Sequence, residues 1–245
     1  MDERCIFVTG ASSDIGVELI NSIGDNYSMI YAHYRNDNES FSALKESFGE
    51  RLFPLKGDFL NREDPGHLLD IIKERGVFPD HFVHLPSDKM TGSRFHKRDP
   101  EDFRHSMDIS FMSAAALLNG LIGSMAKKRY GRIIFMLSSC ILGRAPAYQS
   151  PYVTSKYALF GLMKALSSEY ASKGITVNGI SPDMMDTRFH DGTLKKEVVL
   201  KENAEINPLG RNIAIGDVIP VISYLLSDAA EAVTGQNIAV TGGVR

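Results

Sequence analysis

The chain has 245 residues, 43% of them hydrophobic and 23% charged, and its formal net charge is −3. A chain of this length can bury one large core, so we expect a single domain over residues 1–245. The weak negative charge gives no electrostatic footprint for nucleic acid, and the basic cluster at 127–129 is explained as the last turn of a helix.

The cysteines and the hydropathy of the chain indicate in which cellular compartment the protein is expected. Cys5 and Cys140 have no spacing typical of a metal site or a disulfide framework, and two thiols fit a reducing compartment. No apolar run approaches the ~20 residues needed to span a bilayer, and residues 1–4 lead directly into a predicted strand. We therefore expect a cytoplasmic protein that neither enters a membrane nor is exported.

Short apolar runs alternate with amphipathic segments along the whole chain. The apolar runs predict strands over 5–8, 29–34, 51–55, 81–85, 132–137, 175–180 and 237–240. Apolar residues three and four apart predict helices over 15–23, 39–48, 64–75, 100–130, 152–172 and 217–226. This alternation requires a parallel sheet with helices on both faces. The predicted fold class is α/β, a Rossmann-type doubly wound parallel sheet of about seven strands in a single domain.

A glycine-bearing turn joins the first predicted strand to the first helix. The turn contains Gly10, Ser12, Ser13, Asp14, Ile15 and Gly16. Gly10 and Gly16 allow the backbone to approach a ligand closely, and the helix N-terminus supplies unpaired N–H groups. A strand, such a turn and a helix N-terminus in this order predict a cradle for a pyrophosphate.

A second motif places a phenol and an ammonium on one helix face. Tyr152 and Lys156 are four residues apart in a predicted helix, and Ser139 lies thirteen residues before Tyr152. A nearby positive charge lowers the pKa of a phenol and makes it a usable general acid or base. The spacing alone is a weak signal, because a tyrosine at the start of a helix is more often a packing residue.

Together these motifs resemble the short-chain dehydrogenases/reductases, closest in general pattern to the 3-oxoacyl-carrier-protein reductases, over residues 4–243. The matching pieces follow the order of that family: 9–16, 57–59, 132–139, 152–156, 177–182 with Thr187, 208–211, and 233–236 with 242–243. The resemblance implies that Ser139 donates a hydrogen bond to a substrate carbonyl and that Tyr152 protonates its oxygen. Lys156 would lower the pKa of Tyr152 and hold the nicotinamide ribose.

The resemblance also assigns the two ends of a bound dinucleotide. It places Asp58, with Phe59 packed beside it, at the adenine side, and Pro182 and Thr187 at the nicotinamide carboxamide. Arg35 follows the second strand, where an acid typically binds the ribose of NAD and a basic residue meets the 2′-phosphate of NADP. We therefore expect NADP (NADPH), with NAD less favoured. A solvated loop arginine at 35 and a helix-initiating carboxylate at 58 are the alternatives.

Three places depart from the family pattern. Asp14 replaces its middle glycine, and we interpret this residue as a helix cap. His84 begins a His-Leu-Pro-Ser segment in place of the family's Asn-Asn-Ala-Gly, so other contacts must form the adenosine side of the site. We expect His84 to be a buried, hydrogen-bonded histidine, and we expect no metal site. Ser110 aligns with the fourth catalytic residue, an asparagine that supports a water in the proton relay. We expect serine to preserve a helix distortion that turns a backbone carbonyl toward that water.

The intact Ser139, Tyr152 and Lys156 predict an NADP(H)-dependent oxidoreductase that interconverts a ketone, such as a 3-oxoacyl thioester, and a secondary alcohol. The changes at 84–87 and 110 leave open a dinucleotide-binding protein with little or no turnover, acting as a sensor or as a partner in a complex. By resemblance, residues 183–210 form a flap over a small-molecule carbonyl or alcohol substrate. Helices 100–130 and 152–172 would pair subunits into a homotetramer or homodimer.

Overall fold

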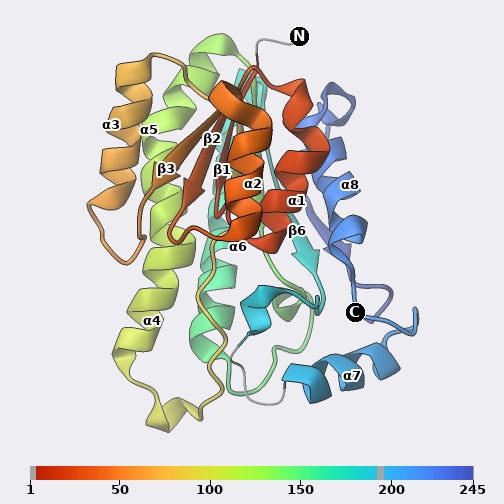
Figure 1. Ribbon diagram of the computed structural model, residues 1–245. Helices are drawn as coiled ribbons and strands as arrows, with labels where there is room; N and C mark the ends of the chain where they lie inside the picture. Colours follow the sequence, from red (N-terminus) through yellow and green to blue (C-terminus); the bar gives the residue numbers. More distant parts are fainter. Residues whose placement is uncertain (1–3, 192–195, 245) are drawn as a thin grey trace.

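The computed structural model describes residues 4–191 and 196–244 of the chain (Figure 1). One parallel sheet of seven strands has the order β3-β2-β1-β4-β5-β6-β7. The strands are β1 (Cys5–Thr9), β2 (Met29–Tyr34), β3 (Leu52–Lys56), β4 (His81–His84), β5 (Gly131–Met136), β6 (Ile175–Pro182) and β7 (Asn237–Val240). The strand order reverses between β1 and β4, which is the switch point where open sheets bind ligands. The predicted fold class is confirmed.

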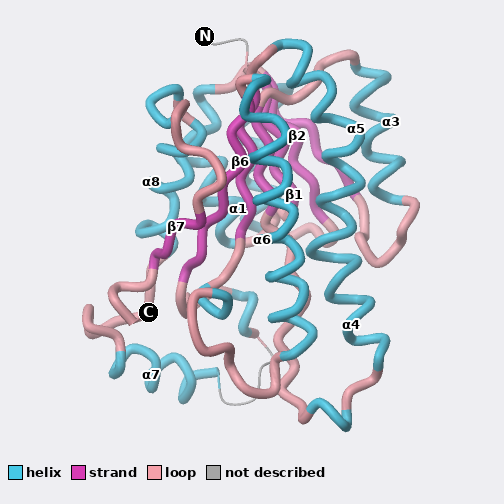
Figure 2. Tube along the Cα trace, turned by 180° about the vertical axis from the view of Figure 1, so that it is seen from behind, coloured by secondary structure: helices cyan, strands magenta, loops and turns pink. Residues whose placement is uncertain are grey.

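Helices cover both faces of the sheet (Figures 1 and 2). They are α1 (Asp14–Ile23), α2 (Glu39–Phe48), α3 (Asp64–Arg75), α4 (Pro100–Met107), α5 (Ser113–Lys128), α6 (Ser150–Tyr170), α7 (Lys196–Ile206) and α8 (Ile215–Leu226). Buried side chains of α1, α2 and α8, such as Leu19 and Ile222, form one core cluster with the sheet. Those of α3, α5 and α6, such as Leu68, Leu121 and Met163, form the other.

One predicted helix is interrupted. The sequence predicts a continuous helix over 100–130, but a π-helical segment, Asp108–Met112, separates α4 from α5. Directly after this segment, Ser113 Oγ donates to the Ile109 carbonyl at 2.6 Å, so a side chain inserts into the hydrogen-bond ladder. The other predicted helices and strands lie within a few residues of their expected bounds.

The same stretch, Pro100–Lys128, is long and apolar enough to cross a membrane by length and composition alone. The expectation that the chain has no such run is therefore wrong. Leu117, Leu121 and Met125 of this stretch are fully buried in the second core cluster. A core helix passes the same test of length and composition, so packing explains the apolar side chains.

Gly179 lies on β6 where α6 packs against the sheet, and it provides a stability test. A Cβ at this position would lie 2.4 Å from Leu137 Cδ1 and 3.0 Å from Met163 Sδ. We expect Gly179→Ala to lower the free energy of unfolding by ~1–3 kcal/mol through overpacking. Gly216→Ala, whose added Cβ has nothing within 4 Å, is the matched control and should be neutral or stabilising by up to ~1 kcal/mol. Urea unfolding of both variants measures this, and equal stabilities would contradict the tight packing of α6 on β6.

Candidate active site

The carboxyl ends of the strands border a cavity of about 790 Å³. It extends from the turn after β1 to the end of β6 and the segment 183–190 that follows it. Most residues that the sequence assigns to a site line this cavity: Gly10, Ser12, Ser13, Asp14, Ile15, Arg35, Asp58, Phe59, Ser139, Tyr152, Lys156, Pro182 and Thr187. Gly16 and Ser110 are buried and do not line it.

The turn after β1 allows a close approach to its backbone. Gly10 has a φ of +72°, in the left-handed region, and its N–H donates to His33 Nδ1 at 3.2 Å. A Cβ at Gly16 would lie 2.6 Å from the Gly10 carbonyl oxygen, so α1 packs directly on the turn. Ser13 caps α1, since its Oγ accepts from the Gly16 N–H at 3.1 Å. The positive end of the helix dipole therefore faces the cavity, which suits a pyrophosphate.

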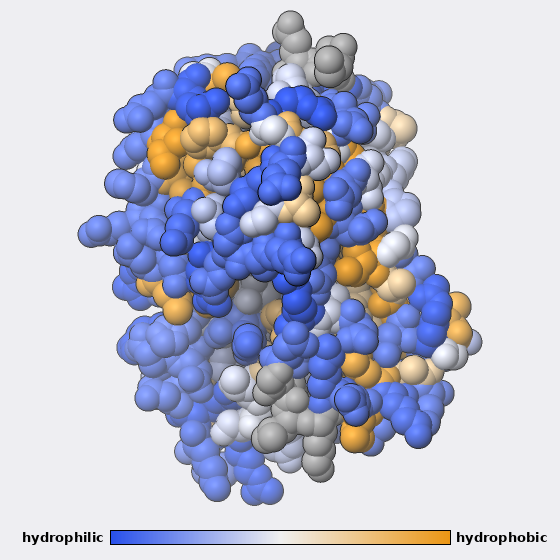
Figure 3. Space-filling model, in the orientation of Figure 1, coloured by the Kyte–Doolittle hydropathy of each residue, from blue (hydrophilic) through white to orange (hydrophobic). Residues whose placement is uncertain are grey.

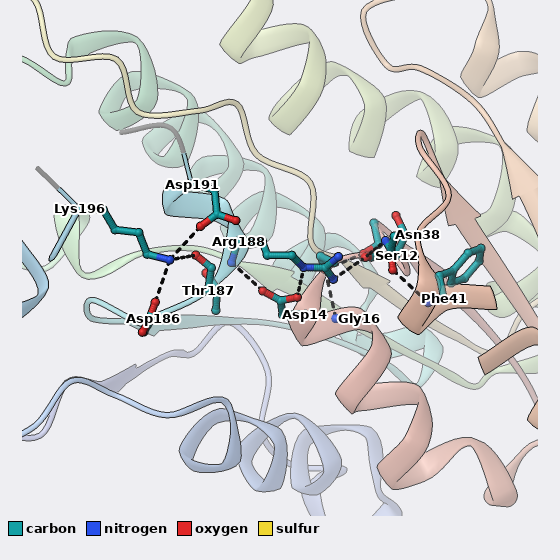
Figure 4. Close-up of polar contacts among 12 residues, drawn as sticks. Ser12, Asp14, Gly16, Asn38, Phe41, Asp186, Thr187, Arg188, Asp191 and Lys196 are labelled. Atoms are coloured by element: carbon teal, nitrogen blue, oxygen red, sulfur yellow. Dashed lines mark hydrogen bonds and ion pairs between the residues drawn. The ribbon is translucent and has the colours of Figure 1, made fainter. Parts of the chain in front are cut away.

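Asp14 is not the helix cap that the sequence suggested, because Ser13 has that role. The Asp14 carboxylate instead accepts hydrogen bonds from the Arg188 backbone N–H, at 2.7 Å, and from the Arg188 guanidinium. The same guanidinium donates to the Ser12 carbonyl at 3.2 Å (Figure 4). The charge of Asp14 is thus compensated, and the turn after β1 is joined to the segment after β6.

A lysine holds the start of α7 to that same segment (Figure 4). Lys196 Nζ lies 2.9 Å from carboxylate oxygens of both Asp186 and Asp191, and 3.4 Å from the Thr187 carbonyl. Residues 192–195 of the predicted flap lie outside the described residues. In the described part of the flap, Lys196 ties α7 to the residues that precede it.

The ends of β2 and β3 form the other end of the cavity. Arg35 is exposed and has no ion pair among residues 4–191 and 196–244. Asp37 also lines the cavity, but Lys45 Nζ lies 2.5 Å from its carboxylate. The ring of Phe59 stacks on His33, with centroids 4.1 Å apart. α3 begins at Asp64, so the alternative in which Asp58 initiates a helix is wrong.

The three residues assigned to proton transfer gather near the end of β5. Ser139 follows β5, Tyr152 and Lys156 lie in the first turns of α6, and all three side chains are buried. Lys156 Nζ donates to the Met136 carbonyl at 2.8 Å and lies 5.6 Å from the centre of the Tyr152 ring. Tyr152 and Lys156 thus share one helix face beside the last residue of β5.

Burial controls the protonation of this pair. Burial, with a smaller contribution from Cys140, raises the pKa of Tyr152, and a hydrogen bond with Ser138 opposes this. Burial also lowers the pKa of Lys156 to about 8. In the protein by itself, the pKa of Tyr152 is therefore raised and not lowered as the sequence suggested, because burial disfavours the charged phenolate. Tyr152 is protonated at neutral pH, as a general acid requires.

One acidic residue of this site, Asp183, was not identified from the sequence. Asp183 follows Pro182 at the end of β6, is buried, and accepts a hydrogen bond from Ser139 Oγ at 2.6 Å. The sequence assigns it only to the flap. The signal that could have found it is its position, since a carboxylate directly after a strand of this sheet lies at the ligand-binding edge.

Two departures from the family pattern contact each other. Ser110 lies in the π segment and is fully buried, and its carbonyl accepts from His84 Nε2 at 2.9 Å. A carbonyl can only accept, so Nε2 carries a proton, while Nδ1 lies 2.8 Å from Thr9 Oγ1. Burial, together with the charge of Lys156, lowers the pKa of His84 to about 3, which keeps the ring neutral. The buried, hydrogen-bonded histidine and the helix distortion are confirmed, but the carbonyl expected to hold a water holds His84.

Proteins of similar sequence and structure cover nearly the whole chain. The model of a family described as enoyl-(acyl carrier protein) reductase matches residues 10–245. A 3-oxoacyl-[acyl-carrier-protein] reductase of Rickettsia felis is 28% identical over 242 residues, which are 97% of this chain and 95% of the relative. A gluconate 5-dehydrogenase from Burkholderia cenocepacia, solved in complex with NADP and tartrate, has a TM-score of 0.88 at 21% identity, with 100% of this chain and 96% of that chain covered. A 3-oxoacyl-[acyl-carrier protein] reductase from Brucella melitensis with bound NAD has a TM-score of 0.85 at 22% identity, with 99% and 91% covered.

We expect Ser110→Asn to leave turnover unchanged or to reduce it. The Ser110 side chain is fully buried and its carbonyl is bound by His84, so the longer amide adds volume without gaining a water to hold. Turnover of any accepted ketone and affinity for the cofactor are the measurements. Ser124→Asn, a half-buried serine of α5 outside the site, controls for asparagine in this helix. A several-fold rise in turnover for Ser110→Asn alone would show that the native relay lacks the amide.

Proposed function

This chain belongs to the short-chain dehydrogenase/reductase family, and we propose that it interconverts a ketone and a secondary alcohol with NADP(H) through Ser139, Tyr152 and Lys156. It is an oxidoreductase that acts on CH–OH groups. The observation that carries the proposal is the placement of these three residues at one end of a cavity whose other end is the turn after β1. Reduction of an activated ketone by NADPH tests it and separates an enzyme from a dinucleotide-binding protein without turnover.

Each of the three side chains has a distinct part in the proposed reduction. NADPH, when bound, supplies the hydride. Tyr152 donates its phenolic proton to the carbonyl oxygen, and Lys156 offsets the negative charge left on the phenolate. Ser139 orients the carbonyl oxygen by donating a hydrogen bond to it. In the oxidation of an alcohol, the same proton returns to Tyr152.

The residues of the cavity fit a dinucleotide. The N-terminus of α1 suits the pyrophosphate, and Arg188 compensates the charge of Asp14 that would otherwise repel it. Exposed Arg35, without an ion pair in the described part of the chain, is available to a 2′-phosphate. Asp37 could bind a ribose hydroxyl of NAD instead, but it is already paired with Lys45. In the same proposal Asp58 and Phe59 contact the adenine side, while Pro182 and Thr187 contact the nicotinamide.

The segment 183–210 closes over the substrate in this proposal. Apolar side chains reach the surface over α7 (Figure 3), where Val198 is 48% and Ile206 is 68% exposed. Val199, on the same helix, lines the cavity. Exposed apolar side chains beside a site fit a ligand with an apolar portion, such as the acyl chain in the name of the Rickettsia relative.

Helices α4, α5 and α6 form the subunit contact that we propose. Met112, in the π segment, and Tyr157, on α6, are 49% and 46% exposed. Aromatic and methionine side chains of this kind are enriched at protein interfaces, which supports a homotetramer or homodimer. We place the protein in the cytoplasm, in line with its two thiols and weak net charge.

We expect Tyr152→Phe to lower turnover by ~10²–10⁴-fold, because it removes the general acid while preserving the ring that packs in the site. Tyr157→Phe removes the hydroxyl of an exposed tyrosine on the same helix and should retain near-full turnover. Steady-state kinetics with a ketone, cofactor titration and thermal unfolding are measured for both variants. Near-full turnover of Tyr152→Phe would remove Tyr152 from the mechanism.

We expect NADPH to bind ~10–100-fold more tightly than NADH, because a charge-assisted hydrogen bond from Arg35 to the 2′-phosphate contributes ~1.5–3 kcal/mol. Arg35→Ala should remove most of this difference, and Asp37→Asn should leave it in place. Calorimetric titration of each protein with both cofactors is the measurement. Equal affinities in the native protein, or an unchanged ratio in Arg35→Ala, would contradict the assignment, and weaker NADH binding by Asp37→Asn would assign the ribose to Asp37.

A further inference from the structure

Asp183 is a buried acid for which the proposed reaction has no use. Its side chain is 8% exposed, lines the cavity and has no ion pair within the described ranges. The Asp183 N–H donates to the Val240 carbonyl at 3.1 Å, so the end of β7 fixes its backbone. The carboxylate therefore has a set position at the reacting end of the cavity.

The contact between Ser139 and Asp183 decides where the serine proton points. A carboxylate oxygen only accepts, so in the 2.6 Å contact Ser139 Oγ donates to Asp183 Oδ1. A hydroxyl carries a single proton. While this bond holds, Ser139 cannot donate to a substrate carbonyl. The role that Ser139 has in the proposed reaction thus requires another donor to take its place at Asp183.

The second oxygen of the carboxylate lacks a donor. Oδ2 of Asp183 is buried and has no hydrogen-bond partner among the residues that the structure describes. A carboxylate can accept about four hydrogen bonds, and a buried acceptor without a partner is costly. Lys156, the buried cation of the site, donates to the Met136 carbonyl. The site therefore has more capacity to accept hydrogen bonds than the protein's own donors fill.

We propose that Asp183 binds a hydroxyl group of the substrate, carried on the carbon next to the reacting carbonyl. This inference rests on the proposed function, since it takes the carbonyl to lie at Ser139 and Tyr152. A hydroxyl on the neighbouring carbon lies beside the carbonyl oxygen, just as Asp183 lies beside Ser139. When that hydroxyl donates to Asp183, the Ser139 proton is released to the carbonyl oxygen. The substrate class is an α-hydroxy ketone or, in the direction of oxidation, a vicinal diol.

This class differs from the 3-oxoacyl thioester that the sequence resemblance suggests. A 3-oxoacyl thioester has no hydroxyl on the carbon next to its ketone. The Ser139 hydroxyl would therefore go on donating its hydrogen bond to Asp183. An ammonium group could also donate to Asp183, but the buried Lys156 lies in the same site and would repel it. A neutral hydroxyl therefore fits the charges of the site best.

A matched pair of ketones tests the proposal. 1-Hydroxypropan-2-one and butan-2-one have the same number of heavy atoms and differ only in carrying a hydroxyl or a methyl group on the carbon next to the carbonyl. We expect the native protein with NADPH to favour the hydroxy ketone by about 10–100-fold in kcat/KM, the range for a hydrogen bond to a charged group. Asp183→Ala should reduce this preference to near one.

Two further variants keep the result interpretable. Asp183→Asn preserves the shape of the side chain and should lower the preference even if Asp183→Ala fails to fold, which thermal unfolding would reveal. Asp70→Asn removes an exposed acid of α3 and should leave the preference unchanged. Equal kcat/KM for the two ketones in the native protein, or a preference that survives both changes at 183, would overturn the inference while leaving the ketone reductase intact.

Binding measured without turnover separates this inference from the proposed function. Both ketones are titrated onto the native protein and the Asp183 variants and followed by NMR line broadening of the ligand. If neither ketone is reduced but the hydroxy ketone binds preferentially, and only when Asp183 is present, the inference stands and the proposed reaction does not. If neither is reduced and neither binds preferentially, the inference is overturned.

Discussion

The site depends on the hydrogen bond between the Lys156 ammonium and the Met136 carbonyl. A buried ammonium is costly unless its protons are accepted by other groups, and the 2.8 Å contact provides an acceptor at the last residue of β5. The bond fixes the N-terminal part of α6 against the carboxyl edge of the sheet. Tyr152, one turn earlier on the same helix face, is placed by the same contact. Close packing of α6 over Gly179 keeps the helix near enough for this bond to form.

Residues far apart in the sequence compensate for the departures from the family pattern. The carboxylate of Asp14 would disfavour a pyrophosphate, but Arg188 neutralises it from the other side of the cavity (Figure 4). Ser110 loses the amide of the family's asparagine, and His84 binds its carbonyl. In both cases an altered residue in one motif contacts an altered or unassigned residue in another. Each departure is therefore best judged together with the residue that contacts it.

Local patterns predicted the strands and most of the helices, because apolar periodicity and turn residues act over a few neighbours. They did not predict α7 or the break between α4 and α5. The carboxyl ends of parallel strands meet at one edge, so residues that follow strands could be placed together without coordinates. The partners of Asp14, Ser110 and Ser139 could not, since each lies between 26 and 174 residues away. The direction of the pKa shift of Tyr152 could not be predicted from the sequence either. It depends on how completely the folded chain excludes water from the phenol.

The protonation of the Tyr152 and Lys156 pair determines the state from which the proposed reaction starts. Burial raises the pKa of Tyr152, so the phenol holds its proton until a carbonyl oxygen takes it. The phenolate that remains must be stabilised by a charge, and the pKa of Lys156, about 8, leaves roughly nine-tenths of the amine charged at pH 7. Above pH 8 that charge is lost, and the phenolate has no cation to offset it. In the proposed reaction, reduction therefore starts from the protonated phenol that burial favours at neutral pH, whereas oxidation must first remove that proton.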